Sequence, residues 1–150
     1  MAFSHEKLIV YQKSLEFNRS AYQLIKNKKI KGDLRDQLSR ASHSIVLNIA
    51  EGNGKRSKKD RAHFLNRAQG SGTECAGCLD LMVTEDKISK IEAEEEKEIL
   101  EEIVRMLSRM SDNLTSHAVR EEGVDYGSDR NYKKIEEEIV RDQEEEEEKE

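Results

Sequence analysis

Cys75 and Cys78 form the motif in this chain that most directly suggests chemistry, because a CxxC pair can bind zinc or cycle between thiol and disulfide. A structural zinc ion needs about four ligands, and the sequence holds no second CxxC pair and no HxxxH pair. The histidines are scattered singly, at His5, His43, His63 and His117. Redox chemistry of the thioredoxin type belongs to a βαβ context, which the sequence does not indicate. We therefore expect reduced, metal-free cysteines that pack as small residues in a core or an interface, with metal or redox chemistry as the less favoured alternative.

A basic run from Lys55 to Arg61 contains five bases and one acid, at the start of a predicted helix. Cations near a helix N-terminus oppose the helix dipole by about 0.3–1 kcal/mol each. A bound phosphate would reverse that cost, since free backbone N–H groups and the dipole both favour an anion. Gly52 and Gly54 would let the backbone approach such a group. We expect a contact with RNA or DNA here, against the alternative of a merely solvated turn.

The basic surface is expected to extend beyond the run itself. The candidate nucleic-acid-binding residues are Arg35, Arg40, Lys55, Arg56, Lys58, Lys59, Arg61 and Arg67. Interleaved aromatic residues, which stack on the bases of single strands, are missing from this set. The sequence therefore favours contact with the sugar-phosphate backbone over recognition of bases.

Asn48 and Glu51 lie one helical turn apart near the end of an apolar stripe. A catalytic interpretation would make Glu51 a general base, but no paired carboxylate, nucleophile or metal cluster accompanies it. The sequence also has no P-loop, no glycine-rich dinucleotide motif after a strand and no serine-triad pattern. We therefore expect neither catalysis nor a cofactor. The prediction for Asn48 and Glu51 is a buried or half-buried hydrogen-bond network that fixes helix register.

Four segments with helical periodicity must position these residues, and they span about 4–29, 33–51, 57–82 and 89–119. Asp33 is a plausible N-cap, and Ser57 with Asp60 resembles a capping box. The expected inward residues are Leu8, Tyr11, Leu15, Tyr22 and Ile25; Leu34, Leu38, Ala41, Ile45 and Ile49; Leu65, Ala68, Gly72, Cys75, Leu79 and Met82; and Ile99, Ile103, Met106, Met110 and Leu114. Short links between long helices favour an antiparallel up-down four-helix bundle.

Composition agrees with this all-α class. The 150 residues are 39% charged and include no proline, the residue that most strongly interrupts a helix. Residues 141–150 alone supply −5 of the net charge of −6. We expect a bundle over residues 1–120 and a short charged extension over 121–150, in which Ile135, Ile139 and Val140 support at most a short helix before a disordered acidic end. No stretch is long and apolar enough for a membrane span or a secretory signal, so the expected location is cytoplasmic.

The string from Ser44 to Ser57, SIVLNIAEGNGKRS, resembles the signature of the bacterial four-helix-bundle proteins encoded in intervening sequences of 23S rRNA genes, the S23 family. Supporting matches run through about residues 6–115, including Val10-Tyr11-Gln12-Lys13 and Phe64-Leu65. The chain lacks the proline that the family usually has near Val46, and the acidic end lies outside the pattern. The resemblance implies a fold similar to accessory proteins of diversity-generating retroelements and a homo-oligomer, with a pentamer as the expected number.

Taken together, the sequence predicts a non-enzymatic, homo-oligomeric four-helix-bundle protein that binds RNA or DNA backbone through the basic turn before the third helix. The alternative is a protein-interaction adaptor, such as an accessory partner of a reverse transcriptase, without a nucleic-acid contact of its own.

Overall fold

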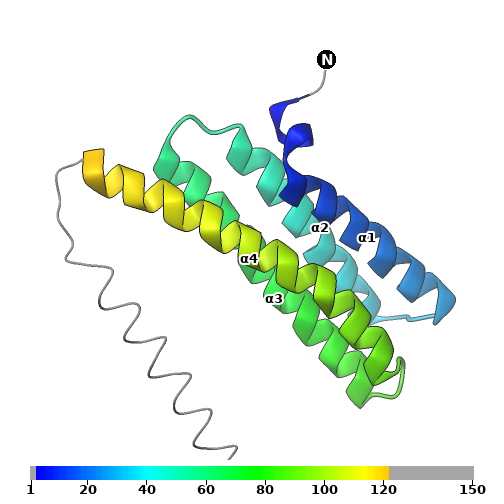
Figure 1. Ribbon diagram of the computed structural model, residues 1–150. Coiled ribbons are helices and arrows are strands. Elements are labelled where there is room, and N and C mark those ends of the chain that lie inside the picture. Colours follow the sequence, from blue (N-terminus) through cyan, green and yellow to red (C-terminus); the bar gives the residue numbers. More distant parts are fainter. Residues whose placement is uncertain (1–2, 122–150) are drawn as a thin grey trace, which may run out of the picture. The chain divides into compact units, whose positions relative to one another are not determined.

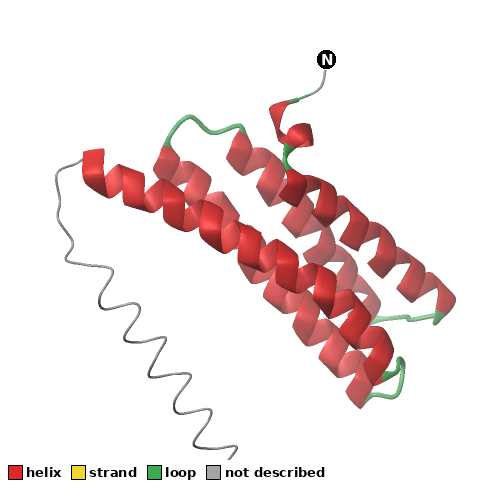
Figure 2. Ribbon diagram, viewed as in Figure 1, coloured by secondary structure: helices red, strands yellow, loops and turns green. Residues whose placement is uncertain are grey.

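The computed structural model describes residues 3–121, and these residues form helices and no strands (Figure 2). A short 3-10 helix, η1 (Ser4–Lys7), precedes α1 (Ile9–Asn27), α2 (Asp33–Asn53), α3 (Lys58–Thr84) and α4 (Lys90–Glu121). Short links join consecutive helices, which run antiparallel beside one another (Figure 1). The predicted up-down four-helix bundle is confirmed. The predicted acidic extension lies beyond Glu121 and is therefore outside the described residues.

Two serines begin helices in the manner that the sequence suggests. The Ser57 hydroxyl accepts a hydrogen bond from the backbone N–H of Asp60 at 3.2 Å, which confirms the expected cap of α3. Ser89 and Glu92 form a complete capping box before α4: the Ser89 hydroxyl accepts from the Glu92 N–H, and the Glu92 carboxylate accepts from the Ser89 N–H. Asp33 is the first residue of α2 and not its cap, since Gly32 takes that place with φ of 72°. None of the helices within the described range is long and apolar enough to cross a membrane.

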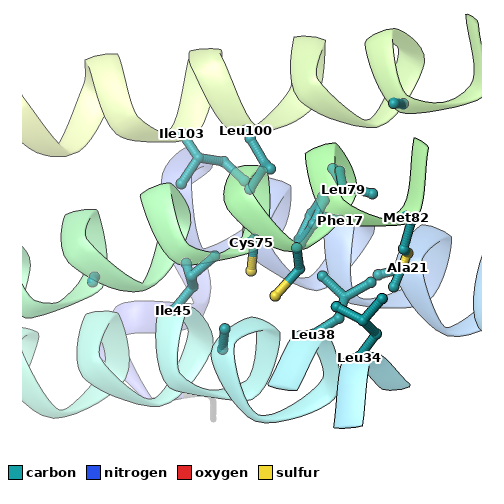
Figure 3. Packing of buried hydrophobic residues seen from close by; sticks show 14 of the residues in the cluster. Phe17, Ala21, Leu34, Leu38, Ile45, Cys75, Leu79, Met82, Leu100 and Ile103 are labelled. Carbon is teal, nitrogen blue, oxygen red and sulfur yellow. The ribbon is translucent and has the colours of Figure 1, made fainter. Parts of the chain in front are cut away.

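The core runs along the bundle axis and is built mainly from α2 and α3 stripes with period three and four (Figure 3). All five expected inward residues of α2 are buried, and so are all six of α3. Gly72 is one of them, and a Cβ added there would lie 2.9 Å from Cγ2 of Val104 on α4. Because real Cβ atoms do not approach so closely, the glycine lets α4 pack against the α3 backbone. The stability that Gly72 costs the helix is offset by that packing.

The expected inward stripe of α1 is confirmed only in part, because Leu8, Tyr11 and Ile25 are partly buried against the core and the other two residues are not. Leu15 is 44% exposed and Tyr22 is 64% exposed, whereas Phe17 is fully buried. The buried residues of α1 are Val10, Ser14, Phe17 and Ala21. Leu15 and Phe17 are two residues apart, hence about 160° apart around the helix, so only one of them can face the core. The buried stripe has regular spacings of four, three and four residues, but it includes the polar Ser14, so the apolar pattern alone does not reveal it.

The inward stripe of α4 is displaced by one position from the expected one. Ile103 is buried as predicted, but its buried neighbours are Leu100 and Leu107. The other expected residues are only partly buried and pack at the edge of the core; they are Ile99, Met106, Met110 and Leu114. An apolar face broader than three or four residues per two turns leaves the sequence with two registers that satisfy the same periodicity.

Each seam between neighbouring helices, within residues 3–121, contains one side-chain hydrogen bond that involves a serine hydroxyl. The four bonds join Ser42 to Asn18, Ser44 to Ser71, Ser111 to Asn66 and Ser20 to Glu96, at distances between 2.6 and 2.9 Å. A partly buried polar group that loses its partner costs about 1–3 kcal/mol. A helix that slid by one turn would break its bonds at two seams, so these pairs fix the register that apolar packing alone would leave degenerate.

Glu96 is the exceptional member of this set, because it is a carboxylate that is only 9% exposed. Its Oε1 accepts the Ser20 hydroxyl at 2.6 Å, while Oε2 is buried without a hydrogen-bond partner among the described residues. Burial raises the pKa of this carboxyl, and the neighbouring charge of Glu95 acts in the same direction. At two other places on the α1–α4 seam a lysine donates to a carboxylate, namely Lys13 to Glu102 and Lys28 to Glu92. In the part of the chain that the structure describes, no lysine plays this role for Glu96.

We expect Glu96→Gln to stabilise the protein at pH 8, because the amide keeps an acceptor for Ser20 and removes a buried charge. The raised pKa means that the folded state binds a proton more readily than the unfolded chain. The wild type is therefore relatively more stable below the unfolded carboxyl pKa of about 4.3 and loses that advantage as the pH rises through the folded pKa. Urea unfolding midpoints between pH 4 and pH 8 should show a gap that widens with pH. The exposed neighbour serves as control in Glu95→Gln, and a Glu96→Gln variant less stable than the wild type at pH 8 would contradict this prediction.

Candidate nucleic-acid interface

The basic turn, defined here as Gly54 to Arg61, connects α2 to α3 and is closed by backbone hydrogen bonds. The Gly54 N–H donates to the Glu51 carbonyl and the Lys55 N–H to the Gly52 carbonyl, each at 3.1 Å. The Arg61 N–H then donates to the Ser57 carbonyl at 3.0 Å as α3 begins. Both ends of the turn are thus anchored in helices, and its shape follows from the two adjacent helix termini.

Arg61 fixes this turn with its side chain. Its Nε–H donates to the Lys55 carbonyl oxygen at 2.6 Å, across the width of the turn. The side chain is only partly exposed, because it also lies against the end of the core. A charged donor to a backbone carbonyl is worth more than a neutral one, about 1.5–3 kcal/mol. The structure therefore gives Arg61 a structural role within the predicted binding set.

Phe64 brings two of the predicted cations together. Nζ of Lys55 lies 5.2 Å from the centre of the Phe64 ring, and Cζ of Arg67 lies 5.8 Å from it. Both distances are within the range of cation–π attraction, about 0.5–1 kcal/mol at an exposed site. A cation from the turn and one from the third turn of α3 thus belong to one cluster.

The same ring covers the end of α2. A Cβ placed on Gly52 would lie 2.8 Å from Cβ of Phe64, so Gly52 must lack a side chain for the ring to reach this position. His63 lies beside it, with ring centres 5.6 Å apart in an edge-on arrangement. Aromatic residues were not expected within the basic surface, so sequence reasoning missed both rings. The spacing in the sequence could have indicated the position of Phe64, because it lies one helical turn from Arg61 and one turn from Arg67.

Charge around the turn is only partly neutralised within the described residues. Lys55 has its Nζ 3.9 Å from a Glu51 carboxylate oxygen, an exposed pair of little energetic value. Arg56 and Lys59 are exposed on the turn and the first turn of α3. Lys58 is half-buried and takes part in an interaction of its own. The result is a cationic surface on the end of the bundle where α2 ends and α3 begins.

Two predicted residues lie elsewhere. Arg35 is in the first turn of α2 and pairs with Asp36 at 3.0 Å. At 1.5 Å per residue it lies about 27 Å from the end of α2, and Arg40 lies about 20 Å from it. Both side chains are exposed. The structure therefore groups Lys55, Arg56, Lys58, Lys59, Arg61 and Arg67, and it separates Arg35 and Arg40 from them.

For the polar pair of α2, Asn48 and Glu51, the predicted hydrogen-bond network is confirmed at the first residue only. Asn48 is 7% exposed, and its Nδ2 donates to the Ser44 carbonyl at 2.8 Å and to the Ser44 hydroxyl at 2.9 Å. Ser44 in turn bonds to Ser71 on α3, which confirms a buried network at this point. The prediction for Glu51 is wrong, because its side chain is 57% exposed. Three residues beyond Asn48, it is rotated about 60° further from the core.

Both cysteines are buried in the α3 seam, as predicted, and both thiols are free. Figure 3 shows Cys75 among the core side chains. Burial raises the pKa of Cys75 to about 12, with smaller contributions from Cys78 and Glu74 in the same direction. Burial also raises the pKa of Cys78. A thiol with so high a pKa is a poor nucleophile and a poor metal ligand at neutral pH, because the thiolate is the reactive form. Residues 3–121 contain no group of three or more His, Cys, Asp or Glu side chains that could hold a metal ion.

The fold and this end of the bundle define a small all-helical bundle protein with a cationic surface at one end. The chain belongs to the family of 23S rRNA-intervening sequence proteins, whose model matches residues 6–109. It is also similar to a crystallised protein of unknown function from the S23 ribosomal protein family of Bacteroides thetaiotaomicron VPI-5482. That similarity has a TM-score of 0.64 and 26% identity, and it covers 69% of this chain and 98% of the other. Comparison with curated proteins finds no match. The resemblance noted in the sequence is therefore confirmed.

We expect Asn48→Ala to destabilise the fold by about 1–3 kcal/mol, since it removes buried hydrogen bonds at the α2–α3 seam. Glu51→Ala should change stability by no more than about 0.5 kcal/mol, because the side chain is exposed and its ion pair is weak. Urea unfolding at pH 7 measures both. Equal decreases in stability for the two variants would show that Glu51 has a buried role that its position does not indicate.

Proposed function

We propose that this protein is a non-enzymatic, self-assembling bundle that binds RNA or DNA through the basic turn. The observation that supports this most is the convergence of Lys55 and Arg67 on Phe64. Because both cations lie near one ring, charges that are separate in the sequence form a compact cluster with defined geometry. Phosphate contacts of this kind position a nucleic acid without reading its sequence.

The location of the cluster also favours phosphate. The turn precedes α3, a helix of 27 residues, so the positive end of a long dipole points at it. Exposed cations at that position are repelled by the positive end of the dipole. A bound phosphate would offset that repulsion, because its negative charge is attracted both by the cations and by the dipole. The family description names an intervening sequence of 23S rRNA, which makes RNA the first nucleic acid to test.

The alternative is an adaptor whose basic turn contacts an acidic protein surface, for example on a reverse transcriptase. Salt dependence distinguishes the two, because phosphate binding releases condensed counterions and weakens steeply and regularly as salt rises.

We expect the change of Lys55, Arg56, Lys58 and Lys59 to glutamine to preserve the fold and weaken RNA binding about equally for different sequences. The slope of log affinity against log salt should fall by about 0.7 for each single-strand phosphate that the variant no longer neutralises. Fluorescence anisotropy over a salt series measures this. The matched control changes three lysines and one arginine, all exposed, near the opposite end of the bundle: Lys26, Lys31, Arg35 and Lys90.

If both quartets weaken binding equally, the protein binds through its overall charge and not through the turn. Deletion of residues 141–150 should strengthen binding, because it removes a net charge of −5 that competes with phosphate. If neither the full chain nor the truncated one binds RNA or DNA at low salt, the nucleic-acid proposal is wrong and the adaptor function takes its place.

Two surface features support the self-assembly part of the proposal. The outer stripe of α1 exposes Leu15 and Tyr22. On α3, Gly70 and Gly77 are seven residues apart, hence on one face, and a Cβ added at either would meet nothing within 4 Å among the described residues. Each glycine costs a helix about 1 kcal/mol relative to alanine, and no packing at these two positions offsets that cost in residues 3–121 of a single chain.

A head-to-tail ring joins two different surfaces of each subunit, and a bulky apolar stripe against a glycine face would suit such a contact. A pentamer is the number that the family resemblance implies.

We expect the double change Gly70→Ala and Gly77→Ala to stabilise the single chain by about 1 kcal/mol per site while weakening the assembly. Sedimentation across a concentration series measures the assembly, and urea unfolding of the dilute monomer measures stability. Gly72→Ala is the control, since Val104 is in its way and it should destabilise the chain. An unchanged assembly with higher stability would exclude this face of α3 as an interface.

A further inference from the structure

A cavity of about 270 Å³ opens at the same end of the bundle as the basic turn. It lies where the last turns of α2, the first turns of α3, residues 110–114 of α4 and the residue before α1 meet. Its lining residues are Leu8, Ile49, Gly52, Asn53, Arg61, Leu65, Met110, Asn113 and Leu114. Neither phosphate binding nor self-assembly, as proposed above, uses this space.

The lining is divided by chemistry. The walls are aliphatic, with Ile49 and Leu65 among the buried core residues. The polar side chains of the lining are those of Asn53, Arg61 and Asn113. An apolar cavity of roughly 150 Å³ is enough to admit a benzene ring, so this volume suits a single planar heterocycle. A ligand with apolar faces and a polar edge would match the walls and the amides together.

Arg61 connects the cavity to the turn. It lines the cavity, and its Nε–H donates to the Lys55 carbonyl near the start of the basic turn. Gly52 likewise belongs to both, as a lining residue and as the position that Phe64 covers. A strand whose phosphates lie on the turn would therefore have its bases within reach of the cavity mouth.

We propose that the cavity receives one unstacked nucleobase of the strand that the basic turn holds. This inference rests on the proposed nucleic-acid function and adds to it a contact with the base. Aliphatic side chains would cover the two faces of the base, and the carboxamides of Asn53 and Asn113, which offer both donors and acceptors, would meet its edge. The side-chain amide of Asn53 donates one N–H to the Ser4 hydroxyl at 2.7 Å, and this hydrogen bond orients the amide.

The test compares two single-stranded DNA decamers, one with all its bases and one in which every residue is abasic. We expect the protein to bind the complete decamer at least about fivefold more tightly, since an inserted base adds apolar contact to the phosphate contacts. Leu114→Phe, which fills the cavity, should reduce binding of the complete decamer to the level of the abasic one. It should leave binding of the abasic decamer unchanged. Leu81→Phe is the matched control at the opposite end of the bundle, where the native leucine is 48% exposed.

Asn113→Ala provides a second variant in case Leu114→Phe does not fold, because Asn113 is exposed and its loss should not affect the core. It should reduce the preference for the complete decamer. Equal binding of both decamers by the wild type would overturn the base pocket and leave the phosphate function standing. Absence of binding to either decamer at low salt would overturn the phosphate function itself. A preference that survives both variants would place base recognition elsewhere and also overturn the pocket.

Methyl NMR tests the other possible occupant, a segment of this chain. The methyl signals of Met110 and Leu114 should shift when the complete decamer is added, while that of Ile91 at the far end should not. If deletion of residues 122–150 shifts the same two signals without any nucleic acid, the cavity belongs to the chain's own C-terminal residues and the proposal is wrong.

Discussion

Close approach of side chains from one helix to the bare backbone of another is the constraint on which the rest of this bundle depends. Gly72 lets α4 lie against α3, and Gly52 lets Phe64 fold over the end of α2. Any side chain at either position would push its neighbour away. Gly72 determines how α3 and α4 pack. Gly52 determines the position of the Phe64 ring, and Lys55 and Arg67 lie near that ring. The core and the cationic surface thus depend on the same local property, a backbone without a side chain in its way.

The sequence predicted the helices, their order and the core faces of α2 and α3, because these two helices each have one apolar stripe with one possible register. It failed in part for α1, where Leu15 and Tyr22 are exposed and the buried stripe of Val10, Ser14, Phe17 and Ala21 is interrupted by a polar serine. Periodicity reports that a face is apolar and not what covers it. The candidate site was predicted in part for a related reason. Adjacent charges are visible in the sequence, whereas the convergence of Lys55 and Arg67 on Phe64 depends on how the helix turns.

Polar contacts distinguish this bundle from a generic one. A core of Leu, Ile and Ala accepts several helix registers with similar packing energy, but one serine bond at each seam of the described bundle accepts only one. Glu96 shows the cost of this arrangement, since its second carboxylate oxygen is buried without a partner in residues 3–121.

The bond from Arg61 to the Lys55 carbonyl has a kinetic consequence. Together with the Ser57 cap, it holds the turn in one shape in the protein alone. A preorganised surface loses little conformational entropy on association, so no slow folding step would stand between collision and complex. The encounter rate would then be set by long-range attraction between opposite charges, and added salt would act mainly on how often the partners meet. How long they stay together would depend on the short-range contacts that form afterwards.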